Sequence, residues 1–97
     1  NQLQQNGPVK QIQDIEPLAD KWRAFGWHAI EIDGHDLAQV LDAYDKAGTI
    51  TGKPQVVVAR TVKGKGVSFM ELNPGWHGVA PKPEELERAL KELQGVG

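Results

Sequence analysis

The sequence contains no cysteine, so it can form neither a disulfide framework nor a thiolate nucleophile. This absence is consistent with a reducing compartment, and we expect a cytoplasmic protein. No apolar run approaches the roughly 20 residues that a membrane-spanning helix needs, and no membrane partner is expected. A surplus of charge is also lacking, because 11 basic and 13 acidic residues leave a formal net charge of -2. Nucleic-acid-binding proteins usually carry a basic surplus or stripe, so we expect no nucleic acid and only a local anion site.

What the chain does have is ordinary globular composition, with 39% hydrophobic and 25% charged residues in 97 positions. This length allows one small domain with a modest core, or a piece of a larger assembly. The first residues, "NQLQQNG", are polar, lack a starting methionine and end in an Asn-Gly turn signal. Such a start is typical of mid-protein sequence or of a processed chain.

Apolar spacing predicts alternating helices and strands. A helix is expected over 17–25, where Leu18, Trp22 and Phe25 recur at helical spacing and Gly26 follows. The stretch "WHAIEID", residues 27–33, has the β-rich composition of a strand.

A second helix is expected after Asp36, which is placed as the N-cap, with Gln39 completing a capping box and Gly48 ending the helix. Its spacing predicts one apolar face formed by Leu37, Val40, Leu41, Tyr44 and Ala47.

The stretch "QVVVART" is apolar on both faces over 56–59, which predicts a fully buried strand. Strand, helix and buried strand over 27–61 form a βαβ crossover. We therefore predict an α/β fold with a parallel sheet, in which ligands bind beyond the carboxyl ends of the strands.

The loop 61–66 falls at such an end and carries Lys63 and Lys65 between glycines. Free backbone amides, glycine and two cations would suit an anion. The alternative is a solvated turn, because the loop matches neither a Walker A motif nor a dinucleotide fingerprint.

A second loop, "NPGWHGVAP" at 73–81, surrounds His77 with proline and glycine, which would order it for a functional role. A surface histidine without a role is the alternative. His28 is interpreted as a strand residue and His35 as a turn residue. The last stretch predicts an amphipathic helix from Pro83, with apolar Leu86, Ala89, Leu90 and Leu93, and its glycines at 95 and 97 are typical of a terminus or linker.

Four blocks in order, "NQLQQNGP", "LADKWRAFGWHAIEIDGHD", "ARTVKGKGVSFME" and "WHGVAP", closely resemble the later part of the thiamine-diphosphate-binding domain of transketolases. The resemblance runs from Asn1 to the final helix. It implies that residues 1–97 are the C-terminal portion of this N-terminal domain, with its parallel-sheet fold.

The resemblance also implies site residues. The Asn1 side-chain oxygen and the Leu3 carbonyl would bind Mg²⁺ or Ca²⁺, as hard cations that share oxygen ligands with a diphosphate do. Gln5 would lie next to the cofactor pocket, whereas Asn6 departs from the aspartate often found at its position.

For the cofactor itself, the resemblance places Lys63 at the thiamine diphosphate site, where Gly64 and Gly66 let the loop pass close by. His77 would reach the diphosphate and the reacting centre, as a cofactor-binding and catalytic residue. Lys65 is expected to be a surface charge.

The implied reaction is transfer of a two-carbon unit from a ketose phosphate to an aldose phosphate. Transketolases also need an upstream Gly-Asp-Gly segment, upstream histidines and a pyrimidine-binding domain on a partner chain. We therefore expect this chain to be inactive alone, as a fragment or as part of the first subunit of a split transketolase, within a dimer or an α2β2 assembly. Dihydroxyacetone synthase, deoxyxylulose-phosphate synthase and a non-catalytic binding or assembly module are the alternatives, and "FGWHAIEIDGHD" disfavours the synthase of deoxyxylulose phosphate.

Overall fold

The structure is a computed structural model that describes residues 1–95, so the expected role of Gly97 as a terminus or linker lies outside it. The chain forms two compact units. The sheet unit comprises residues 15–61. The loop unit comprises residues 1–14 together with the described residues from Val62 onward. Within residues 1–95, no helix is both long and apolar enough to cross a membrane.

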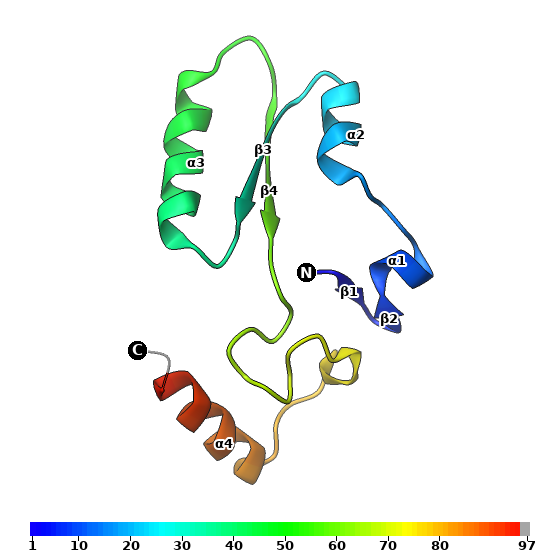
Figure 1. Ribbon diagram of the computed structural model, residues 1–97, viewed down its shortest axis with the longest axis vertical. Helices are drawn as coiled ribbons and strands as arrows, with labels where there is room; N and C mark the ends of the chain where they lie inside the picture. Colours follow the sequence, from blue (N-terminus) through cyan, green and yellow to red (C-terminus); the bar gives the residue numbers. More distant parts are fainter. Residues whose placement is uncertain (96–97) are drawn as a thin grey trace. The chain divides into compact units, whose positions relative to one another are not determined.

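The sheet unit contains the predicted crossover. Helix α2 (Leu18–Ala24) precedes strand β3 (His28–Asp33), and helix α3 (Leu37–Thr49) connects β3 to strand β4 (Gln55–Arg60). The two strands are parallel, in register from the pair His28 and Gln55 to the pair Asp33 and Arg60. Figure 1 shows α2 and α3 on opposite sides of these strands. The predicted α/β fold with parallel strands is therefore confirmed.

The core of the sheet unit lies between α2 and the strands. Ala19, Ala29 and Val58 are buried, and Leu18, Trp22 and Val56 pack against them. Small residues on α2 and β3 let the helix lie close to the sheet, and Gly26, with a positive φ of 86°, turns the chain between them. The predicted end of this helix just before Gly26 is therefore confirmed.

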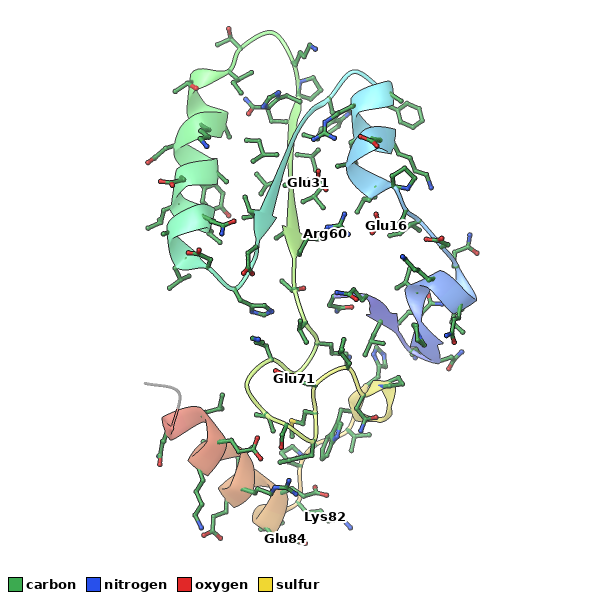
Figure 2. All side chains as sticks on the ribbon, viewed as in Figure 1. Glu16, Glu31, Arg60, Glu71, Lys82 and Glu84 are labelled. Carbon is green, nitrogen blue, oxygen red and sulfur yellow. The ribbon has the colours of Figure 1, made fainter. Side chains whose placement is uncertain are left out.

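Charged side chains extend this face toward the end of β4. The Arg60 guanidinium contacts Glu16 at 2.7 and 3.3 Å and Glu31 at 3.2 Å. Figure 2 shows these three side chains gathered beside the strands. Because the fork of Arg60 holds both carboxylates, it ties the segment before α2 to β3 and β4.

Helix α3 begins as predicted but ends later. The Asp36 carboxylate accepts hydrogen bonds from the Ala38 and Gln39 amides. Gln39 does not close a capping box on the Asp36 amide, because its carbonyl accepts from the Asp33 amide at 2.9 Å. The expected stop at Gly48 is wrong, since the helix continues to Thr49 and Ile50 is the C-cap.

The apolar face expected on α3 is only partly used. Ala43 is buried, but Leu37, Leu41 and Tyr44 are 76%, 65% and 70% exposed. Val40 and Ala47 are half-buried, so the covered side of α3 is the one that carries Val40, Ala43 and Ala47.

The expectation that β4 is fully buried is also wrong. Only Val58 is buried, and Ala59 is exposed. Within residues 1–95 the sheet has two strands, so nothing described covers the second edge of β4. A strand with an apolar run such as 56–59 suits the interior of a wider sheet.

The loop unit begins with a hairpin that the sequence did not predict. Strands β1 (Leu3–Gln4) and β2 (Gly7–Pro8) are antiparallel and are followed by helix α1 (Val9–Ile12). The other part contains the short 3₁₀ helix η1 (Pro74–Trp76) and helix α4 (Pro83–Gln94), which begins at Pro83 as predicted. Val67 and Ala89 are the buried apolar residues described in this loop unit.

Candidate functional site

The loop that carries Lys63 begins directly after β4, as predicted, and forms turns over 63–66. Its amides are less available than the sequence implied. The Lys65 amide donates to the Val62 carbonyl at 3.2 Å, and the Gly66 amide donates to the Glu71 carboxylate at 3.0 Å. The expectation of free amides throughout the loop is therefore wrong, because its own residues satisfy part of them.

The two glycines of this loop have left-handed backbone and close neighbours. Gly64 has a φ of 76°, and a Cβ atom there would lie 2.5 Å from the Met70 carbonyl oxygen. Gly66 has a φ of 92°, and a Cβ atom there would lie 3.0 Å from a Leu93 methyl group of α4. Left-handed backbone and close contact both favour glycine, whether or not a ligand approaches.

The loop closes on itself and is held by α4. The Leu72 amide donates to the Lys63 carbonyl at 3.0 Å, which brings the two ends of residues 63–72 together. The Ser68 amide and hydroxyl both donate to the Glu92 carboxylate. Both hydrogen bonds lower the pKa of the Glu92 carboxyl, and the bond from the Ser68 amide has the larger effect. Lys63, half-buried, is thus part of a fixed turn.

The Trp-His loop is anchored to the same turn through Phe69. The Trp76 indole N–H donates to the Phe69 carbonyl at 3.0 Å, and the two rings lie 5.6 Å apart. The Asn73 side chain caps η1 by accepting from the Gly75 amide. His77 follows at the end of η1 with an exposed side chain. Lys63 and His77 therefore belong to one continuous, internally bonded segment.

The proposed metal ligands lie at the start of the hairpin. The Asn1 Oδ1 atom accepts a hydrogen bond from the Leu3 amide at 3.1 Å, and Gln2 between them has a φ of 64°. Leu3 is paired with Pro8. Because proline has no amide hydrogen, this partner cannot occupy the Leu3 carbonyl. The turn brings Asn1 and Leu3 together, and Gln5 lies in the tight turn between β1 and β2.

The side chains of Lys63 and His77, and the oxygens of Asn1 and Leu3, suit the ligands that the resemblance implies. An ammonium and an imidazole can bind a diphosphate, while neutral amide and carbonyl oxygens suit a hard cation. Among residues 1–95 there is no cluster of three histidine, cysteine or acidic side chains that could hold a metal ion. The hairpin oxygens can therefore supply only part of a coordination shell.

A separate open pocket of about 530 Å³ lies beside α4 and contains none of the predicted site residues. It is lined by Phe69, Asn73, Trp76, Glu84, Glu85 and Arg88. The Arg88 guanidinium stacks over the Phe69 ring at 4.7 Å, and Phe69 in turn packs against Trp76.

Sequence reasoning missed Glu71 and Glu92. Both are acidic residues that hold backbone amides of the Lys63 loop. Glu71 lies only five positions after Gly66, a spacing that could have drawn attention to it. Glu92 lies on a helix whose pattern is that of an ordinary amphipathic helix, so nothing in the sequence pointed to its contact.

The comparison with family models decides the ancestry of the chain. Residues 1–96 match the model described as "Transketolase, thiamine diphosphate binding domain". The chain belongs to this family. The predicted resemblance to transketolases and the predicted fold class are thereby confirmed.

Individual relatives agree with the family. The chain is 40% identical over 97 residues to the 6-deoxy-6-sulfo-D-fructose transketolase subunit SqwG of Clostridium sp. (strain MSTE9), covering 100% of this chain and 35% of that protein. It is 45% identical over 94 residues to an apulose-4-phosphate transketolase subunit of Actinobacillus succinogenes, covering 97% and 34%. Human transketolase is 32% identical over 94 residues, covering 96% and 14%. The chain thus spans about a third of the length of the two bacterial subunits.

Proposed function

We propose that this chain is the later part of the cofactor-binding domain of a thiamine-diphosphate-dependent transketolase. The complete protein would transfer a two-carbon unit from a ketose phosphate to an aldose phosphate. The family match over residues 1–96 carries this proposal, and the segment that joins Lys63 to His77 supports it. The chain alone would be inactive, because it spans only about a third of its subunit relatives.

Within this function, Lys63 and His77 would hold the diphosphate. Thiamine diphosphate, when bound, supplies the carbon nucleophile and the electron sink that the protein side chains lack. The protein would contribute position and charge. Lys63 would present an ammonium from its closed turn, and the exposed His77 imidazole would bind the anion or hold a proton near it.

Asn1 and Leu3 would hold Mg²⁺ or Ca²⁺ against the same diphosphate, with Gln5 beside the cofactor. The support is the turn at Gln2, which brings the Asn1 side-chain oxygen to the backbone of Leu3. Two neutral oxygens leave the remaining positions to water, to the diphosphate and to other parts of the domain.

The partners would be the remainder of this domain and a pyrimidine-binding domain or subunit, in a dimer or an α2β2 assembly. Two relatives are named as transketolase subunits, which supports the split arrangement. Their named substrates are a sulfo-fructose and apulose 4-phosphate. Both are sugar derivatives with an anionic group, so sugar phosphates are the first substrates to test.

The test is made on the complete protein with its partner subunit. Binding of thiamine diphosphate is measured by calorimetry with Mg²⁺, and transfer is measured from xylulose 5-phosphate to ribose 5-phosphate. We expect tight cofactor binding and two-carbon transfer, with weaker binding by Lys63→Ala. Absence of cofactor binding would overturn the proposal. Binding without transfer to any aldose phosphate would favour a non-catalytic module.

A further inference from the structure

The loop proposed to bind a diphosphate already contains an anion of its own. The Gly66 amide donates to the Oε1 atom of Glu71 at 3.0 Å, and Figure 2 labels Glu71 on this loop. We propose that Glu71 is a positioning residue, which fixes the turn at 63–66 in the shape that presents Lys63 to an anionic ligand. This inference rests on the proposed function of Lys63.

The neighbours of Glu71 are fixed against the same turn. On one side, the Met70 carbonyl packs against Gly64, where it leaves no space for a Cβ atom. On the other side, the Leu72 amide donates to the Lys63 carbonyl at 3.0 Å. The Glu71 backbone thus runs alongside residues 63 and 64, and its side chain reaches forward to Gly66. Three consecutive residues hold the turn at three points.

The far side of the loop is held independently by α4. Glu92 accepts from the amide and hydroxyl of Ser68, and Leu93 lies against Gly66. These contacts fix the residues after Gly66. Among residues 1–95, Glu71 is the side chain with a described hydrogen bond to the turn itself, between Lys63 and Val67. Removing its carboxylate should therefore loosen the turn without detaching the loop from α4.

A carboxylate at this place could act in two ways, and the two differ in sign. If Glu71 positions the turn, removing its acceptor weakens ligand binding at Lys63. If Glu71 instead occupies the place of the ligand anion, removing it strengthens ligand binding. The geometry favours positioning, because the contact lies at Gly66 and the adjacent Leu72 amide bonds the Lys63 carbonyl.

The experiment compares thiamine diphosphate dissociation constants for variants of the complete protein with its partner subunit. Glu71→Ala removes the acceptor, and Glu71→Gln keeps an acceptor oxygen without the charge. We expect Glu71→Ala to weaken binding by about tenfold, the value of one hydrogen bond, and Glu71→Gln, which keeps the acceptor, to remain near wild type. Glu87→Ala is the matched control, because this exposed carboxylate contacts only Lys91 among the interactions described for it. It should leave the dissociation constant unchanged.

A second readout does not depend on the cofactor. In the cofactor-free protein, hydrogen exchange of the Gly66 amide should be faster in Glu71→Ala than in wild type or Glu71→Gln. If Glu71→Ala does not fold, Glu71→Asp replaces it, since one methylene less should lengthen the same contact and weaken binding.

Three results would overturn the proposal. These are tighter binding by Glu71→Ala, unchanged binding by a folded Glu71→Ala or Glu71→Asp, and a Glu71→Gln variant as weak as Glu71→Ala. The proposed function has its own indicator in Lys63→Ala. Weakened binding by Lys63→Ala with unchanged binding by Glu71→Ala removes only the role of Glu71. Unchanged binding by Lys63→Ala removes the function of the loop and the role of Glu71 with it.

Discussion

The Trp76 indole N–H donates to the Phe69 carbonyl at 3.0 Å, while the two rings lie 5.6 Å apart. This pair connects the Trp-His loop to the Lys63 turn, which the sequence presented as two separate features. The Trp76 ring packs against the Phe69 ring. The hydrogen bond also fixes the orientation of the Trp76 ring. The backbone that leads to His77 therefore begins at an anchored residue.

Trp76→Phe should separate the packing from the hydrogen bond. Phenylalanine keeps an aromatic ring against Phe69 but has no N–H donor, so we expect a loss of about 1 kcal/mol in the free energy of unfolding. The Phe69 carbonyl keeps a second donor in the Asn73 side chain at 3.3 Å, which limits the loss. Chemical denaturation of the complete protein measures it. A variant as stable as wild type would mean that the indole donor contributes nothing net.

Two glycine substitutions should change stability in opposite directions. Gly64→Ala places a Cβ atom 2.5 Å from the Met70 carbonyl oxygen in left-handed backbone, so it should lose more than about 1 kcal/mol. Gly48→Ala lies within α3 with nothing within 4 Å of the added atom, so it should gain about 0.5–1 kcal/mol. Urea unfolding of both variants is the measurement. A stabilised Gly64→Ala would show that the turn differs from the one described.

The stability given by Asp36 should depend on pH. The Gln39 side chain, and then its amide, lower the pKa of the Asp36 carboxyl below its ordinary value of 3.8. A carboxyl with a lowered folded-state pKa stabilises the fold above its unfolded pKa and loses this effect as the pH falls through the folded pKa. Asp36→Ala should therefore lower the melting temperature at neutral pH, with a difference that shrinks as the pH falls below 3.8.

Asp36→Asn is the matched variant, because asparagine keeps a capping oxygen without a titrating group. We expect it to remain closer to wild type than alanine does at neutral pH. Asp42→Asn, on the same helix, serves as the control for a change of charge. A melting difference for Asp36→Ala that is the same at pH 7 and pH 3 would contradict the assignment.

Secondary structure was predicted best where a repeating apolar pattern extended over many residues. The four elements from α2 to β4, and α4, follow from helical spacing, capping residues and β-branched runs. The hairpin β1–β2 and α1 were missed because two-residue strands and one helical turn are too short to show a period. The burial of β4 was overestimated because burial depends on neighbouring strands, and the described residues provide only β3.

The candidate site was predictable in position but not in its internal bonds. Lys63 and His77 were placed in loops by glycine, proline and strand ends. The satisfaction of the Gly66 and Ser68 amides was not predicted. Glu71 is near Gly66 in sequence, but its contact depends on how the loop closes, and Glu92 reaches Ser68 from 24 positions away on α4. Side-chain contacts of this kind become visible only when the backbone path is known.

Asn1→Ala should weaken Mg²⁺-dependent cofactor binding in the complete protein. It removes an oxygen that lies beside the Leu3 backbone and that we propose as a cation ligand. The Mg²⁺ concentration for half-maximal thiamine diphosphate binding should rise by about tenfold or more. Asn1→Asp keeps the oxygen and should remain near wild type. Gln11→Ala, an exposed amide on α1, is the control, and equal Mg²⁺ titrations for Asn1→Ala and wild type would remove the metal assignment.

His77→Ala should lower turnover or cofactor affinity in the complete protein, whereas Lys65→Ala should change little. His77 follows the anchored Trp76 and has an exposed side chain, so its loss leaves the Phe69 contact and the fold in place. A charge-assisted hydrogen bond to a diphosphate contributes about 1.5–3 kcal/mol, which is about tenfold or more in rate or affinity. Lys65 is exposed, so its charge is screened by salt. Steady-state transfer with titrated thiamine diphosphate measures both variants. If His77→Ala equals wild type in both quantities, His77 is a structural residue at the end of η1.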